Sequence, residues 1–170
     1  MKADDATVEA WLRGRLPDGW FEAVELRMDR DEVLVIGTLP EPPLAAEQDD
    51  DARRAAAAAR IDGFREDTRD ARIALAGEAE RRFERKVSWG ARCGTVERRF
   101  TVANVPVMTR LLLDERRVLD TLIDGGIARS RSEALAWCVK LVGTKQSEWI
   151  DELREALVAV ERVRRSGPKT

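Results

Sequence analysis

The chain has 170 residues, of which 44% are hydrophobic and 36% charged, and its formal net charge is −2. This length and composition suit one ordinary domain or two small ones with a hydrophobic core, and they exclude a largely disordered protein. No run of eighteen apolar residues occurs, so a membrane-spanning helix is not expected, and the acidic start MKADDATVEAW lacks the apolar region of a signal peptide. We therefore expect a cytoplasmic protein with no membrane contact.

Catalytic chemistry is restricted by the absence of two residue types, histidine and tyrosine. Histidine is the side chain whose ordinary pKa suits acid–base work near neutrality, and it is the commonest metal ligand. The two cysteines, Cys93 and Cys138, cannot complete a tetrahedral zinc site, and we expect both to be free thiols. Glycine-rich phosphate-binding loops are also missing. The sequence predicts no enzyme activity, no catalytic residue, no metal site and no cofactor.

Residues 1–40 read as a small helix-hairpin unit. Val8, Trp11 and Leu12 have helical spacing, while residues 23–28 and 33–36 have the pattern of two strands joined by a polar turn. This unit either stabilises the rest of the chain or docks a protein partner. Residues 41–50, rich in proline and acids, are expected to form a linker.

A long amphipathic helix is predicted over residues 51–86, because apolar or small side chains recur every three or four positions. That stripe consists of Ile61, Phe64, Thr68, Ala71, Leu75, Ala79 and Phe83. The charged residues between them, Arg65, Glu66, Asp67, Arg69, Asp70 and Arg72, are interpreted as a solvated face. Gly63 and Gly77 are the expected places for bends.

A second hairpin is predicted from residue 87, with strands over residues 87–93 and 96–102 and a turn at Gly94. Arg98 and Arg99 lie beside Phe100 in the sequence, which combines phosphate-binding and base-stacking side chains. The alternative is a sheet with core aromatics and an arginine-rich outer face. Both interpretations stay open on the sequence alone.

The segment from Val105 to Val142 carries the most distinctive pattern. A β-prone stretch, residues 105–112, leads into a helix with an acidic start, which Gly125 and Gly126 end. Ser130 and Glu133 have the spacing of a capping box at the start of a second helix. That helix is apolar nearly all round, which predicts burial against a partner chain. A further amphipathic helix follows from Ser147 to near Arg165, with a tail over residues 166–170.

Strand, helix, glycine turn and Ser-capped helix resemble the ribbon-helix-helix DNA-binding proteins of the Arc, MetJ and CopG type. The resemblance implies a homodimer whose paired strands, residues 107–111, enter the major groove of DNA. It places Val107, Thr109 and Leu111 toward the core and Met108, Arg110 and Leu112 outward. The residues that it implies for phosphate contact are Arg129, Ser130, Arg131 and Ser132.

Taken together, the sequence predicts a mostly helical α+β protein. The helix-hairpin unit and the long helix precede a domain, residues 87–165, in which the second hairpin leads into a ribbon-helix-helix-like dimerising core with an extra C-terminal helix. The whole chain also resembles uncharacterised actinobacterial proteins.

The functional expectation is a homodimeric DNA-binding protein of the nucleoid, either a transcriptional regulator or a nucleoid-associated protein. Residues 83–145 hold twelve basic and seven acidic side chains, although an arginine-rich chain also scatters such residues on solvated faces. The predicted DNA-contacting residues are Met108, Arg110, Arg98, Arg99, Arg129, Ser130, Arg131 and Ser132. The alternative is a non-enzymatic protein that uses the same fold only to dimerise and to bind protein or ribonucleoprotein partners.

Overall fold

The structure, a computed structural model, describes residues 4–43 and 49–167, without the side chains of Glu161 and Arg165. The chain forms two compact units, Met1–Pro106 and Val107–Thr170. Within the described ranges there are six helices and one four-stranded sheet, which confirms a mostly helical α+β fold. Residues 44–48 of the predicted linker and residues 168–170 of the predicted tail lie outside these ranges.

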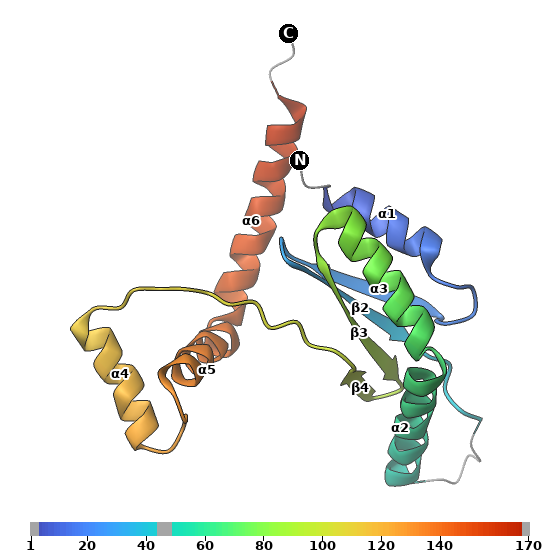
Figure 1. Cartoon of the computed structure of the whole chain (residues 1–170), viewed down its shortest axis with the longest axis horizontal. Helices are drawn as coiled ribbons and strands as arrows, with labels where there is room; N and C mark the ends of the chain where they lie inside the picture. The colour runs from blue at the N-terminus through green and yellow to red at the C-terminus, as the bar shows by residue number, and fades with distance from the viewer. Residues whose placement is uncertain (1–3, 44–48, 168–170) are drawn as a thin grey trace. The chain divides into compact units, whose positions relative to one another are not determined.

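The first unit holds three helices and all the strands found in the described residues (Figure 1). Its elements are α1 Asp5–Arg15, β1 Ala23–Met28, β2 Glu32–Thr38, α2 Asp50–Asp67, α3 Arg69–Phe83, β3 Lys86–Cys93 and β4 Val96–Arg99. The predicted first helix and both hairpins are present, and the second hairpin ends at Arg99, earlier than expected.

The two hairpins join in one mixed sheet of order β1-β2-β3-β4. β2 and β3 pair in parallel, with Val33 opposite Val87 and Val35 opposite Trp89, and both hairpins are antiparallel. A parallel pair needs a long crossover connection, and α2 and α3 supply it. The sequence pattern had assigned the hairpins to separate units, whereas this pairing places both in Met1–Pro106. The division of the chain therefore falls after Pro106 and not before residue 87.

One face of the sheet carries the hydrophobic core. Val33 and Val35 of β2 and Trp89 of β3 pack in one cluster with Val8 and Leu12 of α1. From α3 this cluster takes Leu75, Ala79 and Phe83, and α1 runs beside α3 (Figure 1). A second cluster joins α2 to the end of β3 and includes Ile61, Ala91 and Cys93.

Ion pairs cross the opposite face of the sheet. Arg92 of β3 contacts Glu97 of β4 at 2.7 Å and reaches across β2 to Glu25 of β1 at 3.3 Å. Glu25 lies opposite Ile36 in the strand register, and Ile36 is only 1% exposed. The continuous apolar pattern of β2 therefore reflects a strand that is covered on both faces.

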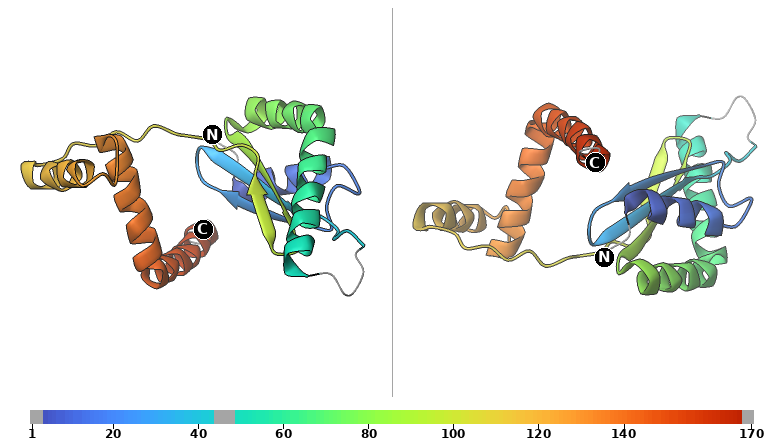
Figure 2. Two further views of the ribbon diagram at one scale, coloured as in Figure 1. Left: turned by 90° about the horizontal axis from the view of Figure 1, so that it is seen from below. Right: turned by 90° about the horizontal axis from the view of Figure 1, so that it is seen from above.

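The predicted long helix is broken at Thr68, and neither glycine is the break. The Thr68 hydroxyl donates to the carbonyl of Phe64 at 2.6 Å, a local hydrogen bond that competes with regular helix geometry. Thr68 separates α2 from α3, and Figure 2 shows the change of direction between them.

The prediction that the charged residues of this helix form a solvated face is wrong at one position. Arg72 is 5% exposed, while Ala71, assigned to the buried stripe, is exposed. The other stripe positions of the second helix, Leu75, Ala79 and Phe83, are buried as predicted, and Arg72 takes the place of Ala71.

The second unit consists of three helices after an extended segment. These are α4 Leu113–Asp124, α5 Arg131–Lys145 and α6 Ser147–Ser166. Gly126, with φ of 75°, turns the chain between α4 and α5, as the sequence predicts. The buried apolar residues in the described part of this unit are Leu119, Ala128 and Ala134, with half-buried neighbours around them. Its core is therefore small for a unit of this length.

Candidate nucleic-acid interface

The segment predicted to form the ribbon strand is extended but unpaired in the single chain. Residues 101–112 carry no helix or strand, so the predicted strand is not formed here. Met108 is 98% exposed and Val107 84% exposed, whereas Leu111 packs against the small core of α4 and α5. Arg110 is exposed. This agrees with the predicted direction of Leu111 and Met108, while Val107 has no core to enter within one chain.

Ser130 caps α5, as predicted, but the second hydrogen bond of the predicted capping box has a different donor. Its hydroxyl accepts from the backbone N–H of Glu133 at 3.2 Å. The Glu133 carboxylate accepts from the backbone N–H of Arg129 at 2.8 Å instead of the N–H of Ser130. This hydrogen bond, with a second one from the Arg129 side chain, holds the pKa of Glu133 below its ordinary value. The loop before α5 is thereby fixed, and Ser132 lies exposed in the first turn.

An ion pair between α4 and α5 engages Arg131. Its Nε and Nη2 donate to the two carboxylate oxygens of Asp120, each at 2.8 Å. These bonds lower the pKa of Asp120 and raise the pKa of Arg131. The planar guanidinium fork matches a carboxylate in this way. Arg131 thus joins the two helices, and its charge is partly balanced within the chain.

Arg98 and Arg99 lie on β4, in the first unit, while the other six predicted contact residues lie in the second. Arg98 donates to both carboxylate oxygens of Asp62 at 2.7 Å and so ties β4 to α2. Arg99 is exposed beside Gly90 on the opposite face of the sheet. The two arginines therefore point to different faces.

Many large apolar side chains are exposed on the second unit. They run along the extended segment and all three helices. The set is Val107, Met108, Leu112, Leu113, Val118, Ile127, Trp137, Val139, Leu141, Val142, Trp149, Leu153, Leu157, Val158, Val160 and Val163. Apolar surface on this scale marks an interaction site. The sequence pattern of α5 predicted such a surface, and α4 and α6 extend it.

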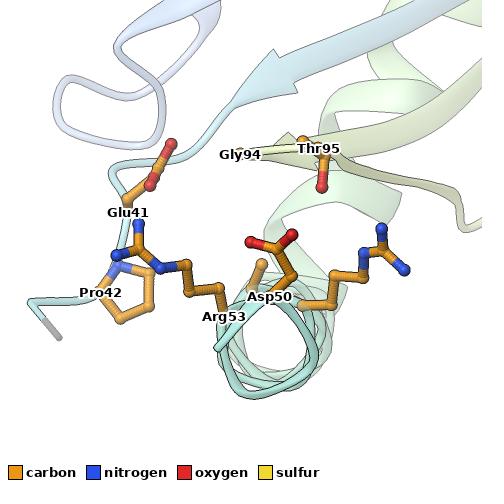
Figure 3. Close-up of a pocket in the computed structure, with 8 residues that line it drawn as sticks. Glu41, Pro42, Asp50, Arg53, Gly94 and Thr95 are labelled. Carbon is orange, nitrogen blue, oxygen red and sulfur yellow. The ribbon is translucent and has the colours of Figure 1, made fainter. Parts of the chain in front are cut away.

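Several hollows lie in the described part of the first unit, and two of them border α2. One, of about 440 Å³, is bordered by Asp50 and Arg53 of α2, by Glu41, and by the turn between β3 and β4 (Figure 3). Its charges are mixed. The other is lined by Arg65, Arg69 and Arg72 around Phe100, and sequence reasoning missed it by treating these arginines as a solvated face. The sequence feature that could have indicated this hollow is the four-residue spacing between Thr68 and Arg72.

No group of three or more histidine, cysteine, aspartate or glutamate side chains in the described ranges is arranged to hold a metal ion. Burial raises the pKa of the Cys93 thiol, so this cysteine is a packed core residue. None of the helices in the part of the chain that the structure describes is long and apolar enough to span a membrane.

The fold and these surfaces define a two-unit α+β protein whose second unit presents large apolar faces. Two family profiles match the chain. One, described as the N-terminal domain of Rv1265-like proteins, matches residues 6–99, and the other, the Mb1296 C-terminal domain, matches residues 113–164. The chain belongs to the Rv1265-like family, and the two matches fall within the two units of the structure.

Its relatives include the uncharacterized proteins Rv1265 of Mycobacterium tuberculosis and Mb1296 of Mycobacterium bovis. Each is 47% identical over 169 residues, and the match spans 99% of this chain and 73% of the relative. These relatives confirm the resemblance to actinobacterial proteins. No solved structure matches the chain.

Proposed function

We propose that this protein is a homodimeric DNA-binding protein, either a transcriptional regulator or a nucleoid-associated protein, in which two copies of residues 107–170 pair. The observation that carries the proposal is the apolar surface of this unit. Among the described residues of this unit only three apolar side chains are buried, while side chains as large as Trp137, Leu141 and Trp149 are exposed. Burying one such side chain contributes about 1.5–3 kcal/mol, so a partner that covers several of them gains a large stabilisation.

A second copy of the chain fits this surface because it brings the complementary elements. The extended residues 107–112 have no strand partner within the chain. The same segment of a second copy can pair with them antiparallel about a twofold axis, which is the commonest symmetry of protein dimers. The apolar faces of the α5 helices then meet each other. The arrangement matches the ribbon-helix-helix resemblance of the sequence.

In such a dimer the outward residues of the paired strands are Met108 and Arg110, which supply an apolar and a cationic contact to DNA. The capped start of α5, with Arg129 and Ser132, offers backbone N–H groups and a positive charge to a phosphate. Both copies contribute, so the positive field on this side of the dimer is doubled. Arg98 and Arg99 remain additional candidates in the first unit.

One observation favours a second function, a protein-interaction module that dimerises without binding DNA. Three of the predicted DNA-contacting arginines already face carboxylates. Arg131 binds Asp120, Arg98 binds Asp62, and Arg129 contacts Glu133 at 3.3 Å. Contact with DNA phosphates has to compete with these ion pairs, whereas a protein partner on the apolar faces does not disturb them.

A gel-shift assay tests the proposal with the full chain and a random-sequence DNA duplex. We expect retention at low salt that weakens steeply as salt rises, since bound arginines release counterions from DNA. Arg110→Ala combined with Arg131→Ala is expected to weaken binding about tenfold or more. Arg154→Ala on α6 is the matched control, because it removes an exposed arginine outside the predicted contact set.

Absence of any DNA retention at low salt rejects the DNA-binding function. Recovery of a defined protein partner after nuclease treatment, together with that absence, supports the interaction module instead. If the control variant weakens retention as much as the double variant, the predicted contact residues are rejected.

A further inference from the structure

A buried cation near the break between α2 and α3 has only neutral partners in the described part of the chain. Arg72 is 5% exposed. Its Nε donates to the Thr68 hydroxyl at 3.0 Å and its Nη2 to the Arg65 carbonyl at 2.6 Å. The guanidinium carbon lies 4.9 Å from the ring centroid of Phe100. The hydrogen bonds and the ring hold the side chain in place, but they do not neutralise its charge.

A second buried arginine, Arg85, has its charge balanced in the usual way, by a carboxylate. Arg85, 7% exposed, forms an ion pair with Asp5 at 2.6 Å. No described carboxylate makes such a pair with Arg72, and the charged side chains that act on it are repulsive. Burial lowers the pKa of Arg72, and the nearby positive charges of Arg65 and Arg69 lower it further. A buried charge without a counter-ion is costly, so an anion brought to this place would be stabilised.

The space for such an anion exists beside Arg72. A hollow of about 420 Å³ is lined by Arg65, Glu66, Arg69, Arg72, Ile73 and Phe100. The lining contains three guanidinium groups and one carboxylate, so its net charge is positive. Ile73 is 58% exposed and forms an apolar wall with Phe100. The volume lies in the range of small-molecule sites, roughly 300–1,000 Å³.

We propose that this hollow binds a small phosphate ester with an apolar group. The phosphate lies among Arg65, Arg69 and Arg72, because guanidinium groups bind phosphate oxygens through paired hydrogen bonds. The apolar group lies against Ile73 and Phe100. A single phosphate would leave the apolar wall unused, and Arg72 is too deeply recessed for the backbone of a duplex. The site lies in the first unit and does not depend on the proposed DNA-binding function.

Isothermal titration calorimetry of the full chain tests the site with phenyl phosphate as the probe, at constant ionic strength set with potassium chloride. We expect saturable binding of phenyl phosphate and weaker binding of inorganic phosphate. Arg69→Gln is expected to weaken both about tenfold. Arg69 is exposed, so this variant leaves the core intact. Ile73→Ser is expected to weaken phenyl phosphate only, since inorganic phosphate does not reach the apolar wall.

Two controls separate this site from other arginines. Arg81→Gln removes an exposed charge from the same helix outside the hollow, and it is expected to bind the probe like the parent protein. Arg154→Gln, on α6 and outside the predicted DNA-contacting set, is expected to do the same. Equal binding by the parent protein and Arg69→Gln overturns the proposal. So does a loss seen only in Arg154→Gln, or displacement of phenyl phosphate by duplex DNA, because each places the anion at another surface.

Discussion

Asp120 and Arg131 show how two exposed side chains join a pair of helices. The two hydrogen bonds from Arg131 and its charge hold the pKa of Asp120 below the ordinary value. A carboxyl group with a depressed folded-state pKa contributes stability above its unfolded pKa of about 3.9, and this contribution is lost as the pH falls through the folded value. The contact between α4 and α5 is therefore predicted to weaken in acid.

The pH dependence of Asp120→Asn tests this link. We expect the parent protein to lose more stability than the variant between about pH 5 and about pH 3, because asparagine has no charge to lose. Urea unfolding followed by circular dichroism at both pH values measures the difference. Asp124→Asn, at the end of the same helix, is the control and is expected to keep the parent's pH dependence. Equal losses in the parent and in Asp120→Asn contradict the role of this ion pair.

At the scale of residues, the sequence pattern predicted helix caps more accurately than it predicted which charged side chains are exposed. Ser130 caps α5 as expected, because a cap depends on neighbours three residues away along the chain. Its partner Glu133 bonds to Arg129 instead of Ser130, a difference of one position that the loop conformation decides. Arg72 was placed in a solvated face because arginine is rarely buried. The Phe100 ring that lies over it directly follows β4 and is far away in the sequence.

At the scale of elements, the loop before β1 packs closely against strand β2. A Cβ atom at Gly37 in β2 would lie 2.0 Å from Cδ1 of Phe21. The Phe21 ring therefore lies on the backbone of β2, and only glycine leaves room for it. Phe21 also contacts Phe64 of α2, with ring centroids 4.9 Å apart, so this glycine allows the aromatic cluster to form.

Gly37→Ala is predicted to destabilise the protein by about 1–3 kcal/mol, the usual cost of overpacking. Gly63→Ala is the matched comparison, since it places the same methyl group within α2 where no atom lies within 4 Å. It is predicted to stabilise by up to about 1 kcal/mol, because alanine favours the helix. Thermal unfolding of both variants measures the contrast. A Gly37→Ala variant as stable as the parent protein would show that Phe21 moves aside freely.

At the scale of the whole molecule, the two units differ in how completely they are folded by their own residues. The sheet of the first unit lies between helices on one face and ion pairs on the other. In the described part of the second unit three apolar residues are buried and many are exposed, which underlies the proposed pairing of two chains.

Size-exclusion chromatography with light scattering tests that pairing directly. We expect a mass of about twice the 19.1 kDa of one chain. Val139→Asp on α5 is predicted to shift the protein toward the monomer, since it puts a charge on an apolar face and 66% of Val139 is exposed within one chain. Thr121→Asp on α4 adds the same charge at a polar position and is predicted to remain dimeric. A monomeric parent protein would sink both the dimer and the ribbon-like DNA contact.

The sequence by itself determined the elements of this protein: the first helix, both hairpins, the Ser-capped α5 and the glycine turn before it. Each depends on residues a few positions apart, so periodicity and caps are enough to find it. Only the tertiary structure decided that β2 pairs with β3, that Thr68 breaks the long helix and that Arg72 is buried beside Phe100. These features depend on contacts between residues distant in the chain, and no local pattern carries that information.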